Sequence, residues 1–212
     1  DPKRAKEAKG ATEEATMKRC SIIIHSTNGN CFTMGSYLKE ELEKRNVDVR
    51  FYRVEDPDLH ILANESETVN NCYEDITALP SATPEKLVKS DMIILGCPTV
   101  FGNVTAEMKS FIDSTIGMCD DKALADKFFA CFTACRNSLC EGTRTLDTLI
   151  YWSQNMGMLH IPFGIHNEIP HCNQPVQGIV HCEGKDGLIS PAPQIGLELA
   201  AYADDLASYI QE

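Results

Sequence analysis

Short apolar runs that alternate with amphipathic segments constrain the fold of this sequence more than any other feature. The first run, Ile22-Ile23-Ile24, is apolar at every position, which is typical of a strand buried on both faces. Further strands are predicted over residues 47–54, 92–96, 128–133 and 158–163. Between and after them, helical spacing of apolar residues predicts helices around Met34 to Leu42 and over residues 85–89, 104–116, 141–155 and 196–210.

Five strands that alternate with helices predict an α/β domain. Its five-stranded sheet should be parallel and doubly wound, with helices on both faces, because parallel neighbours are joined by right-handed crossovers. Ligands of such sheets bind beyond the carboxyl ends of the strands, where the strand order reverses. We therefore expect function in the loops that follow the first, third and fourth strands.

The domain is expected to span residues 19–212. Residues 1–18 are charged and rich in alanine without apolar periodicity, which predicts a flexible N-terminal tail. Residues 55–83 are polar and are expected to be irregular, and residues 164–193 are expected to form a long loop that contains proline and glycine.

Composition excludes several classes of function. A net charge of −12 and a pI near 4.9 disfavour nucleic-acid and anionic-membrane partners, which need clustered Lys and Arg. No apolar run reaches the roughly 18 residues of a membrane span. The ten cysteines are scattered along the chain, in contrast to a secreted disulfide framework. We expect a cytoplasmic protein with mostly reduced thiols.

The loop after the first predicted strand, Ser26 to Thr33, is suited to a phosphate group. Helix starts offer free N–H groups and a positive dipole end, and Gly29 allows close approach of the backbone. The loop lacks the lysine of a triphosphate-binding loop and the glycine pattern of a dinucleotide fold, so we expect a single phosphomonoester. The alternative is an ordinary turn in which Asn or Ser caps the helix.

The loop after the third predicted strand carries the most specific motif. Residues 96–104 read Gly-Cys-Pro-Thr-Val-Phe-Gly-Asn-Val. This segment resembles the Gly-Thr-Pro-Thr-Arg-Phe-Gly-Asn-Met segment of the flavodoxin-like NAD(P)H:quinone oxidoreductases, the tryptophan-repressor-binding-protein family. The resemblance runs from about Cys20 to the C-terminus. It includes Met108, Phe111, Ile112 and Asp113 in the next helix and residues 184–187, Gly-Lys-Asp-Gly.

This resemblance implies a flavodoxin-like sheet that binds FMN non-covalently and uses NAD(P)H as co-substrate. Two electrons would pass to a quinone or similar small acceptor, and the chain would form a homodimer or homotetramer. The flavin would carry the chemistry, so no catalytic side chain and no metal is assigned. The residues implied to bind FMN are Ser26, Asn28, Gly29, Asn30 and Cys31 at the phosphate, Pro98, Thr99, Val100, Phe101, Gly102 and Asn103 in the second loop, and Thr133, Ala134, Cys135, Arg136, Asn137, Ser138 and Leu139 in the third.

The chain departs from the family at four places. Val100 replaces an arginine, and residues 134–139 replace a glycine-rich loop. Asn155 or Met156 stands where the family has a histidine that faces the flavin, and Cys119 stands where a neighbouring subunit would offer an aromatic ring. Arg136 is either a compensating cation beside the flavin, which would stabilise its reduced anionic form, or a surface residue of a solvated loop.

Two other functions remain open from the sequence. One is a flavodoxin-type electron carrier, whose acidic surface would dock basic partners without oxidation of NAD(P)H by the chain itself. The other is a structural homologue that has lost flavin. Purified protein that is colourless and takes up no FMN would remove the enzyme and the carrier together.

Cysteine and histidine clusters leave further alternatives. The spacing of Cys131, Cys135 and Cys140 is loose for an iron–sulfur cluster. Cys135 and Cys140 are either reactive thiols or small apolar fillers. Two adjacent pairs, His171-Cys172 and His181-Cys182, are either a metal site or incidental loop residues.

Overall fold

The computed structural model describes residues 17–183 and 193–211. The strands are β1 Arg19–Ile24, β2 Asp48–Arg53, β3 Met92–Pro98, β4 Phe128–Cys135, β5 Leu159–His160 and β6 Ile179–Cys182. The helices are α1 Asn30–Lys44, α2 Leu59–Glu65, α3 Glu67–Ala78, α4 Pro84–Val88, α5 Ala106–Asp113, α6 Leu139–Asn155 and α7 Pro193–Gln211, and a 3₁₀ turn, η1, covers Ile116–Met118.

The sheet runs in the order β2-β1-β3-β4-β5, and β6 also pairs with β4. All of these pairs are parallel. This is the flavodoxin-like order, in which the chain reverses its direction of growth between β1 and β3. The predicted doubly wound α/β sheet is therefore confirmed, and the loops after β1 and β3 lie next to each other at its carboxyl edge.

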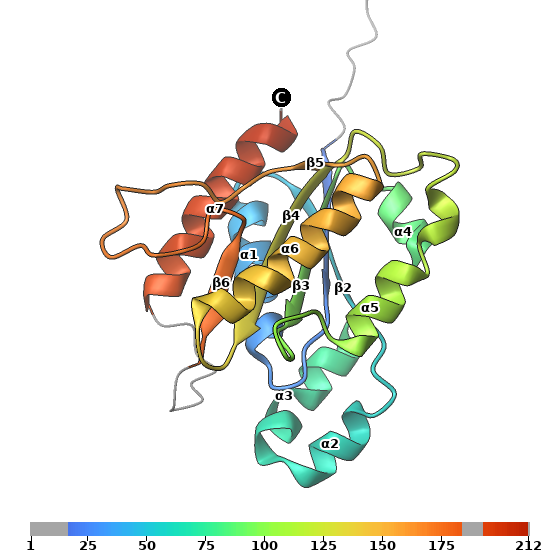
Figure 1. The fold of residues 1–212 in the computed structure, drawn as a ribbon, viewed down its shortest axis with the longest axis vertical. Coiled ribbons are helices and arrows are strands. Elements are labelled where there is room, and N and C mark those ends of the chain that lie inside the picture. The colour runs from blue at the N-terminus through green and yellow to red at the C-terminus, as the bar shows by residue number, and fades with distance from the viewer. Residues whose placement is uncertain (1–16, 184–192, 212) are drawn as a thin grey trace, which may run out of the picture.

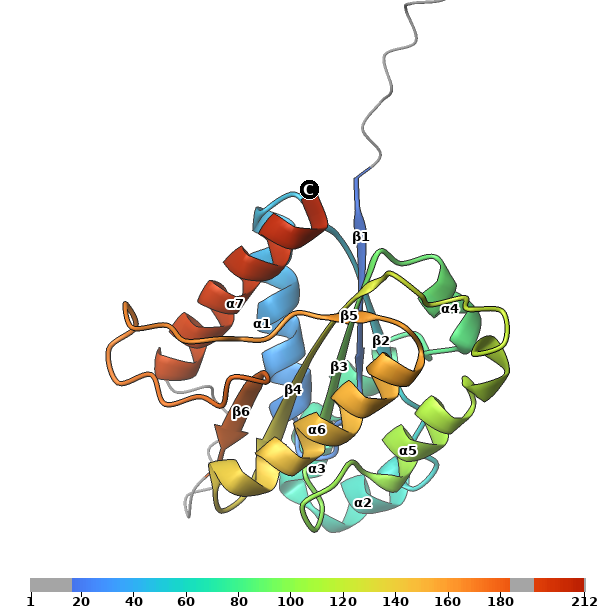
Figure 2. The same cartoon turned by 45° about the horizontal axis from the view of Figure 1, so that its top comes forward.

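Helices cover both faces of the sheet (Figures 1 and 2), and a cluster of buried apolar side chains packs on each face. Because neighbouring side chains on a strand point to opposite faces, Ile22 and Ile24 of β1 pack with α1 and α7, whereas Ile23 packs on the side of α4, α5 and α6. All three isoleucines are almost completely buried. The apolar run read from the sequence is thus a central strand covered on both faces.

The expectation that residues 55–83 are irregular was wrong. They contain α2 and α3, which pack together and bury Leu59, Val69 and Ile76 in a small cluster of their own. Few apolar residues suffice here, because the two helices bury only the surface between them and part of Phe32 on α1. The sulfur of Cys72 on α3 also lies 3.6 Å from the carbonyl oxygen of Thr27, so α3 borders the first loop.

The fifth predicted strand, residues 158–163, is split in the structure. Only Leu159 and His160 pair there, with the start of β4. The chain then leaves the sheet at Pro162, which has no N–H to donate, and returns as β6 beside the end of β4. β6 falls within residues 164–193, which were expected to form only a loop. Residues 184–192 of that loop lie outside the described residues, as do residues 1–16 of the predicted tail.

The excursion between β5 and β6 packs on α7. The hydroxyl of Tyr202 donates to the carbonyl oxygen of Ile161 at 2.6 Å, and the ring of Phe163 meets that of Tyr202 edge to face at 5.5 Å. Both aromatic side chains are buried. In the part of the chain that the structure describes, no helix has the length and apolar character needed to cross a membrane.

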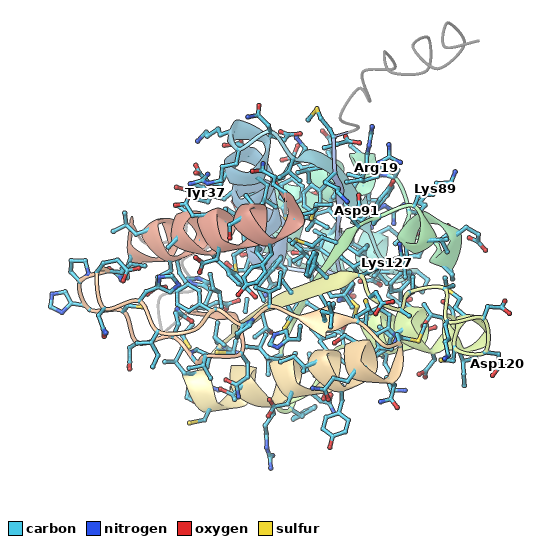
Figure 3. All side chains as sticks on the ribbon, turned by 90° about the horizontal axis from the view of Figure 1, so that it is seen from above. Arg19, Tyr37, Lys89, Asp91, Asp120 and Lys127 are labelled. Atoms are coloured by element: carbon cyan, nitrogen blue, oxygen red, sulfur yellow. The ribbon has the colours of Figure 1, made fainter. Side chains whose placement is uncertain are left out.

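The amino-terminal edge of the sheet is held by charged side chains, seen from above in Figure 3. The backbone N–H of Arg19 donates to the Asp91 carboxylate at 2.8 Å, and the Arg19 side chain donates to Asp48 at 2.9 Å. Lys127 donates to the carbonyl oxygen of Ser90. These contacts tie the starts of β1, β2, β3 and β4 together and leave the opposite, carboxyl edge for the loops.

Close packing of β3 against β4 gives a stability prediction. A Cβ on Gly96 would lie 2.2 Å from the buried ring of Phe132. We expect Gly96→Ala to lower the free energy of unfolding by about 3 kcal/mol, because this ring has no room to move. Chemical denaturation measures the loss. Gly117→Ala is the control, since nothing lies within 4 Å of its Cβ position, and equal stability of the two variants would contradict the packing.

Candidate functional site

The first loop joins β1 to α1 through a left-handed residue. Gly29 has φ 89° and is the N-cap of α1, and its carbonyl oxygen accepts from the backbone N–H of Thr33 at 2.8 Å. The hydroxyl oxygen of Ser26 accepts from the N–H of Phe32 at 3.2 Å. The first N–H groups of a helix have no partner within it, so this loop brings unpaired donors and the positive end of α1 to the carboxyl edge.

Asn30 carries an unsatisfied polar atom at this position. Its side chain is buried, and its Oδ1 is the buried side-chain atom that lacks a hydrogen-bond partner within residues 17–183 and 193–211. Its Nδ2 donates to the carboxylate of Glu183. Because buried polar atoms are nearly always paired, Oδ1 indicates that a ligand with an N–H or O–H donor, or a water, completes the loop.

The second loop is a tight turn. Val100 and Asn103 exchange two backbone hydrogen bonds of 2.9 and 3.0 Å, and the residues between them, Phe101 and Gly102, have φ 49° and 70°. Positive φ at both central positions is the type I′ turn. Glycine adopts it freely, whereas Phe101 does so at a cost of about 1 kcal/mol. Its side chain is nevertheless fully exposed, so the strained turn holds an aromatic ring out into solvent.

Side chains beneath this turn fix its position. Asn103 Oδ1 accepts from the hydroxyl of Thr148 on α6 at 3.0 Å. The hydroxyl of Thr99 lies 2.9 Å from those of Thr133 and Thr145, so the start of the second loop shares one network of hydroxyl groups with β4 and α6. Thr133 is completely buried and forms part of the floor under the loops.

The third loop is shorter than expected. Thr133, Ala134 and Cys135 belong to β4, and Leu139 begins α6. Only Arg136, Asn137 and Ser138 connect the two elements, and all three are exposed. The strand extends further than expected because Ala134 pairs with both β3 and β6, and Cys135 pairs with β6. The sequence analysis did not predict β6, so it could not predict this pairing.

The three loops enclose a cavity of about 240 Å³. A neighbouring cavity of about 620 Å³ shares Thr99, Val100 and Arg136 with it. The first is lined by Ser26, Thr27, Asn28, Asn30, Cys31, Pro98, Thr99, Val100, Thr105, Ala134, Cys135, Arg136 and Glu183. The second is lined by Thr99, Val100, Phe101, Gly102, Arg136, Asn137, Cys140, Glu141 and Arg144.

Most residues expected at the site therefore lie together. Five expected residues do not line either cavity, namely Gly29, Asn103, Thr133, Ser138 and Leu139. Sequence reasoning missed Thr105, Glu183, Glu141 and Arg144, and it did not assign Thr27 of the first loop or the candidate reactive thiol Cys140 to the ligand. Thr105 could have been found as the N-cap of the helix that follows the second loop. Glu183 had no signal, because it follows a strand that the sequence did not show.

Charges around the smaller cavity are unevenly placed. Glu183 lies at the start of α1, and its backbone N–H donates to the carbonyl oxygen of Cys135 at 3.0 Å. Arg136, on the opposite loop, is an exposed cation that lines both cavities.

Behind the first loop, buried His25 forms hydrogen bonds through Nδ1 to the hydroxyl of Thr105 at 2.9 Å and through Nε2 to the Asp56 carboxylate at 3.2 Å. The sequence analysis did not single out this histidine.

Two buried thiols next to the first and second loops, Cys31 and Cys97, are held in the neutral form. Burial raises the pKa of Cys97 to about 12. Burial, with smaller contributions from Cys97 and Glu183, raises the pKa of Cys31 well above its usual value. A neutral thiol next to the start of α1 adds no negative charge there, so the acidic side chain beside this helix start is that of Glu183.

The two histidine–cysteine pairs are separated by the fold. His181 and Cys182 lie on β6, whereas His171 and Cys172 lie in the excursion before it, with His171 exposed. Within the described ranges, no three His, Cys, Asp or Glu residues are arranged to hold a metal ion.

Comparisons with known proteins agree with this geometry. A family model described as NADPH-dependent FMN reductase matches residues 21–166. The chain is 31% identical over 145 residues to the quinone-oxidoreductase QR2 of Triphysaria versicolor, covering 68% of each chain. It is 26% identical over 151 residues to an NAD(P)H dehydrogenase (quinone) of Deinococcus radiodurans, covering 71% of this chain and 76% of that protein.

Solved structures show the same fold at lower identity. A WrbA-like flavodoxin from Agrobacterium tumefaciens matches with a TM-score of 0.60 and 16% identity, covering 91% of this chain and 97% of its own. An archaeal flavodoxin matches with a TM-score of 0.60 and 18% identity, covering 92% and 99%. The family resemblance found in the second loop is thereby confirmed over residues 21–166, and the solved structures show that the flavodoxin-like fold extends over most of the chain.

Proposed function

Because the chain belongs to the NADPH-dependent FMN reductase family, we propose that it passes two electrons from NAD(P)H through FMN to a quinone or similar small acceptor. The observation that carries the proposal is the cavity at the carboxyl edge, to which all three expected loops contribute. The names of the curated relatives, NAD(P)H dehydrogenase (quinone) and quinone-oxidoreductase, support the choice of substrates.

The residues present fit FMN. We assign its phosphate to Ser26, Asn28, Gly29, Asn30 and Cys31, where a helix start faces the cavity. The unpaired Oδ1 of Asn30 is an acceptor for a hydroxyl of the ribityl chain. We assign the ring system to Thr99, Val100, Phe101 and the third loop, at the junction of the two cavities.

When bound, FMN accepts a hydride equivalent and gives up electrons, so the protein supplies position and charge rather than an acid or base. The turn at Phe101 and Gly102 forms one wall of the larger cavity, which is open enough for a second substrate. Arg136 lines both cavities, and we assign it the stabilisation of negative charge on the reduced ring.

A carrier function is the second candidate, and the net charge of −12 favours it. Such a protein would bind FMN but would take electrons from a basic reductase rather than from NAD(P)H. Loss of flavin is the third. The cavity between the three loops and the unpaired Oδ1 of Asn30 argue against it.

One experiment separates the three. The purified chain is loaded with FMN, separated from unbound FMN and mixed anaerobically with NADPH or NADH. We expect the flavin absorbance to bleach within seconds and to return when a quinone is added. Retained colour without bleaching, together with reduction by an added flavodoxin reductase, would identify a carrier. A chain that retains no FMN would overturn the proposal.

We also propose that the chain assembles as a homodimer or homotetramer. Fully exposed Phe101 next to half-exposed Val100 forms an apolar rim at the site, which a second copy would cover. Light scattering of the FMN-loaded protein tests this, and a monomer at micromolar concentration would overturn it. The cytoplasm is the proposed compartment, because all ten cysteines are unpaired.

A further inference from the structure

Two cysteines lie side by side on neighbouring strands at the cavity. Cys135 ends β4 and Cys182 ends β6, and they are directly paired in the parallel register. Their sulfur atoms are 3.0 Å apart. Side chains at paired positions of adjacent parallel strands point to the same face, so this contact follows from the backbone register.

The backbone permits a disulfide at this pair. Adjacent strands lie about 4.8 Å apart, within the roughly 4.4–6.8 Å between Cα atoms that disulfides span. The pairing continues past the cysteines, because the N–H of Glu183 donates to the carbonyl oxygen of Cys135 at 3.0 Å. Oxidation would therefore require rotation of side chains and no movement of the strands.

The pair also borders the cavity to which we assign FMN. Cys135 is a wall residue of the smaller cavity. It is buried, whereas Cys182 is half-buried and accessible to small reagents. In the described part of the chain, no other cysteine pair forms a sulfur–sulfur contact of this kind that also borders the cavity.

We propose that Cys135 and Cys182 form a reversible dithiol/disulfide centre that exchanges one electron pair with the flavin bound beside it. In the reducing direction, the flavin gives a hydride equivalent and solvent gives a proton. The S–S bond breaks, two S–H bonds form and the flavin is left oxidised. The reverse reaction forms the S–S bond, reduces the flavin and releases a proton. The flavin step rests on the proposed function, whereas formation of the disulfide does not.

The two sulfurs have different roles in this exchange. Burial, and then the hydrogen bond that it shares with Cys182, raise the pKa of Cys135 above the usual value for a thiol. Cys135 therefore stays protonated while Cys182, the more accessible sulfur, reacts first with an oxidant. Cys135 then attacks the mixed disulfide on Cys182 as it loses its proton, the S–S bond between the two cysteines forms, and the aromatic thiolate that leaves takes up that proton.

The first test uses the chain without flavin. The protein is treated with a small aromatic disulfide, the remaining thiols are alkylated and the peptides are mapped by mass spectrometry. We expect Cys135 and Cys182 to be linked to each other, exposed Cys119 and Cys140 to carry only the reagent, and dithiothreitol to restore all four thiols. Cys182→Ser should remove the link, whereas Cys72→Ser, at another half-buried thiol, should leave it unchanged. Two free thiols in the wild type after treatment would overturn the proposal.

The second test uses the FMN-loaded chain after the same oxidation. Anaerobic titration with dithionite should consume two electron pairs per flavin in the wild type and in Cys72→Ser, but one pair in Cys182→Ser. One pair in the wild type, with the disulfide proven by mapping, would overturn the exchange with flavin. A chain that forms the disulfide but binds no FMN would overturn the proposed function and the exchange, and would leave the dithiol pair established.

Discussion

Replacing Gly29 with valine is expected to lower the affinity for FMN by about 100-fold while the chain still folds. Gly29 has φ 89° at the start of α1, a conformation that costs a β-branched residue more than about 1–2 kcal/mol. The backbone would relax and turn its N–H groups away from the cavity. Loss of about two hydrogen bonds to a charged phosphate, each about 1.5 kcal/mol, gives the expected factor.

Fluorescence titration of the flavin-free protein measures this effect, because bound FMN is quenched. Gly164→Val is the matched control, since Gly164 has φ 77° and open space around its Cβ position. Gly164 lies in the excursion after β5 and away from the cavity. Both valine variants should lose similar stability, and only the first should lose FMN. Gly29→Asn should be intermediate, because asparagine tolerates this conformation.

Riboflavin separates the phosphate from the ring. It lacks the phosphate, so Gly29→Val should change the affinity for riboflavin by less than about threefold, which is the range expected for a substitution that removes no contact with the ligand. If FMN and riboflavin lose affinity equally, the first loop holds the ring rather than the phosphate. If neither ligand loses affinity, the assignment of the first loop is wrong.

The parts of the fold that the sequence predicted are those with strong local signals. Ile22, Ile23 and Ile24 specify a strand with two buried faces, and the buried strand is what the structure shows. Gly29 in the first loop was expected to let the backbone approach a ligand closely, and it has a positive φ in the structure. Backbone geometry of this kind is set by the residue itself.

Features that depend on distant partners could not be predicted. β6 has only four residues and exists because β4 leaves half of its edge unpaired after β5 ends. α2 and α3 form because they shield each other, with few apolar residues between them. The contact of Glu183 with Asn30 joins residues 153 positions apart. Each depends on register or packing that no single window of sequence contains.

Replacing Glu183 with glutamine is expected to raise the affinity for FMN about tenfold. The Glu183 carboxylate accepts a hydrogen bond from Asn30 at the positive end of α1 and lines the cavity. The carboxylate therefore takes up part of the favourable interaction with the dipole of α1 that the phosphate would otherwise have, and its negative charge repels the phosphate. A partly screened like-charge interaction near a protein surface costs on the order of 1.4 kcal/mol, which corresponds to a factor of ten.

The glutamine variant isolates charge from structure. Its amide oxygen can still accept from Asn30, so the loop should keep its shape, and the affinity for uncharged riboflavin should stay constant. The gain for FMN should shrink as salt is raised, because screening weakens the repulsion in the wild type. Glu141→Gln is the control for net charge, since Glu141 lines the larger cavity away from the start of α1.

A weaker affinity of Glu183→Gln for FMN would show that the carboxylate supports the loop instead of opposing the ligand. An equal gain in Glu141→Gln would show that overall charge, and not the position of Glu183, limits FMN binding. A gain confined to Glu183→Gln and to the phosphorylated ligand would place the phosphate at Asn30. The first loop would then bind its anion with backbone donors and a helix dipole, against a carboxylate that the same chain holds there.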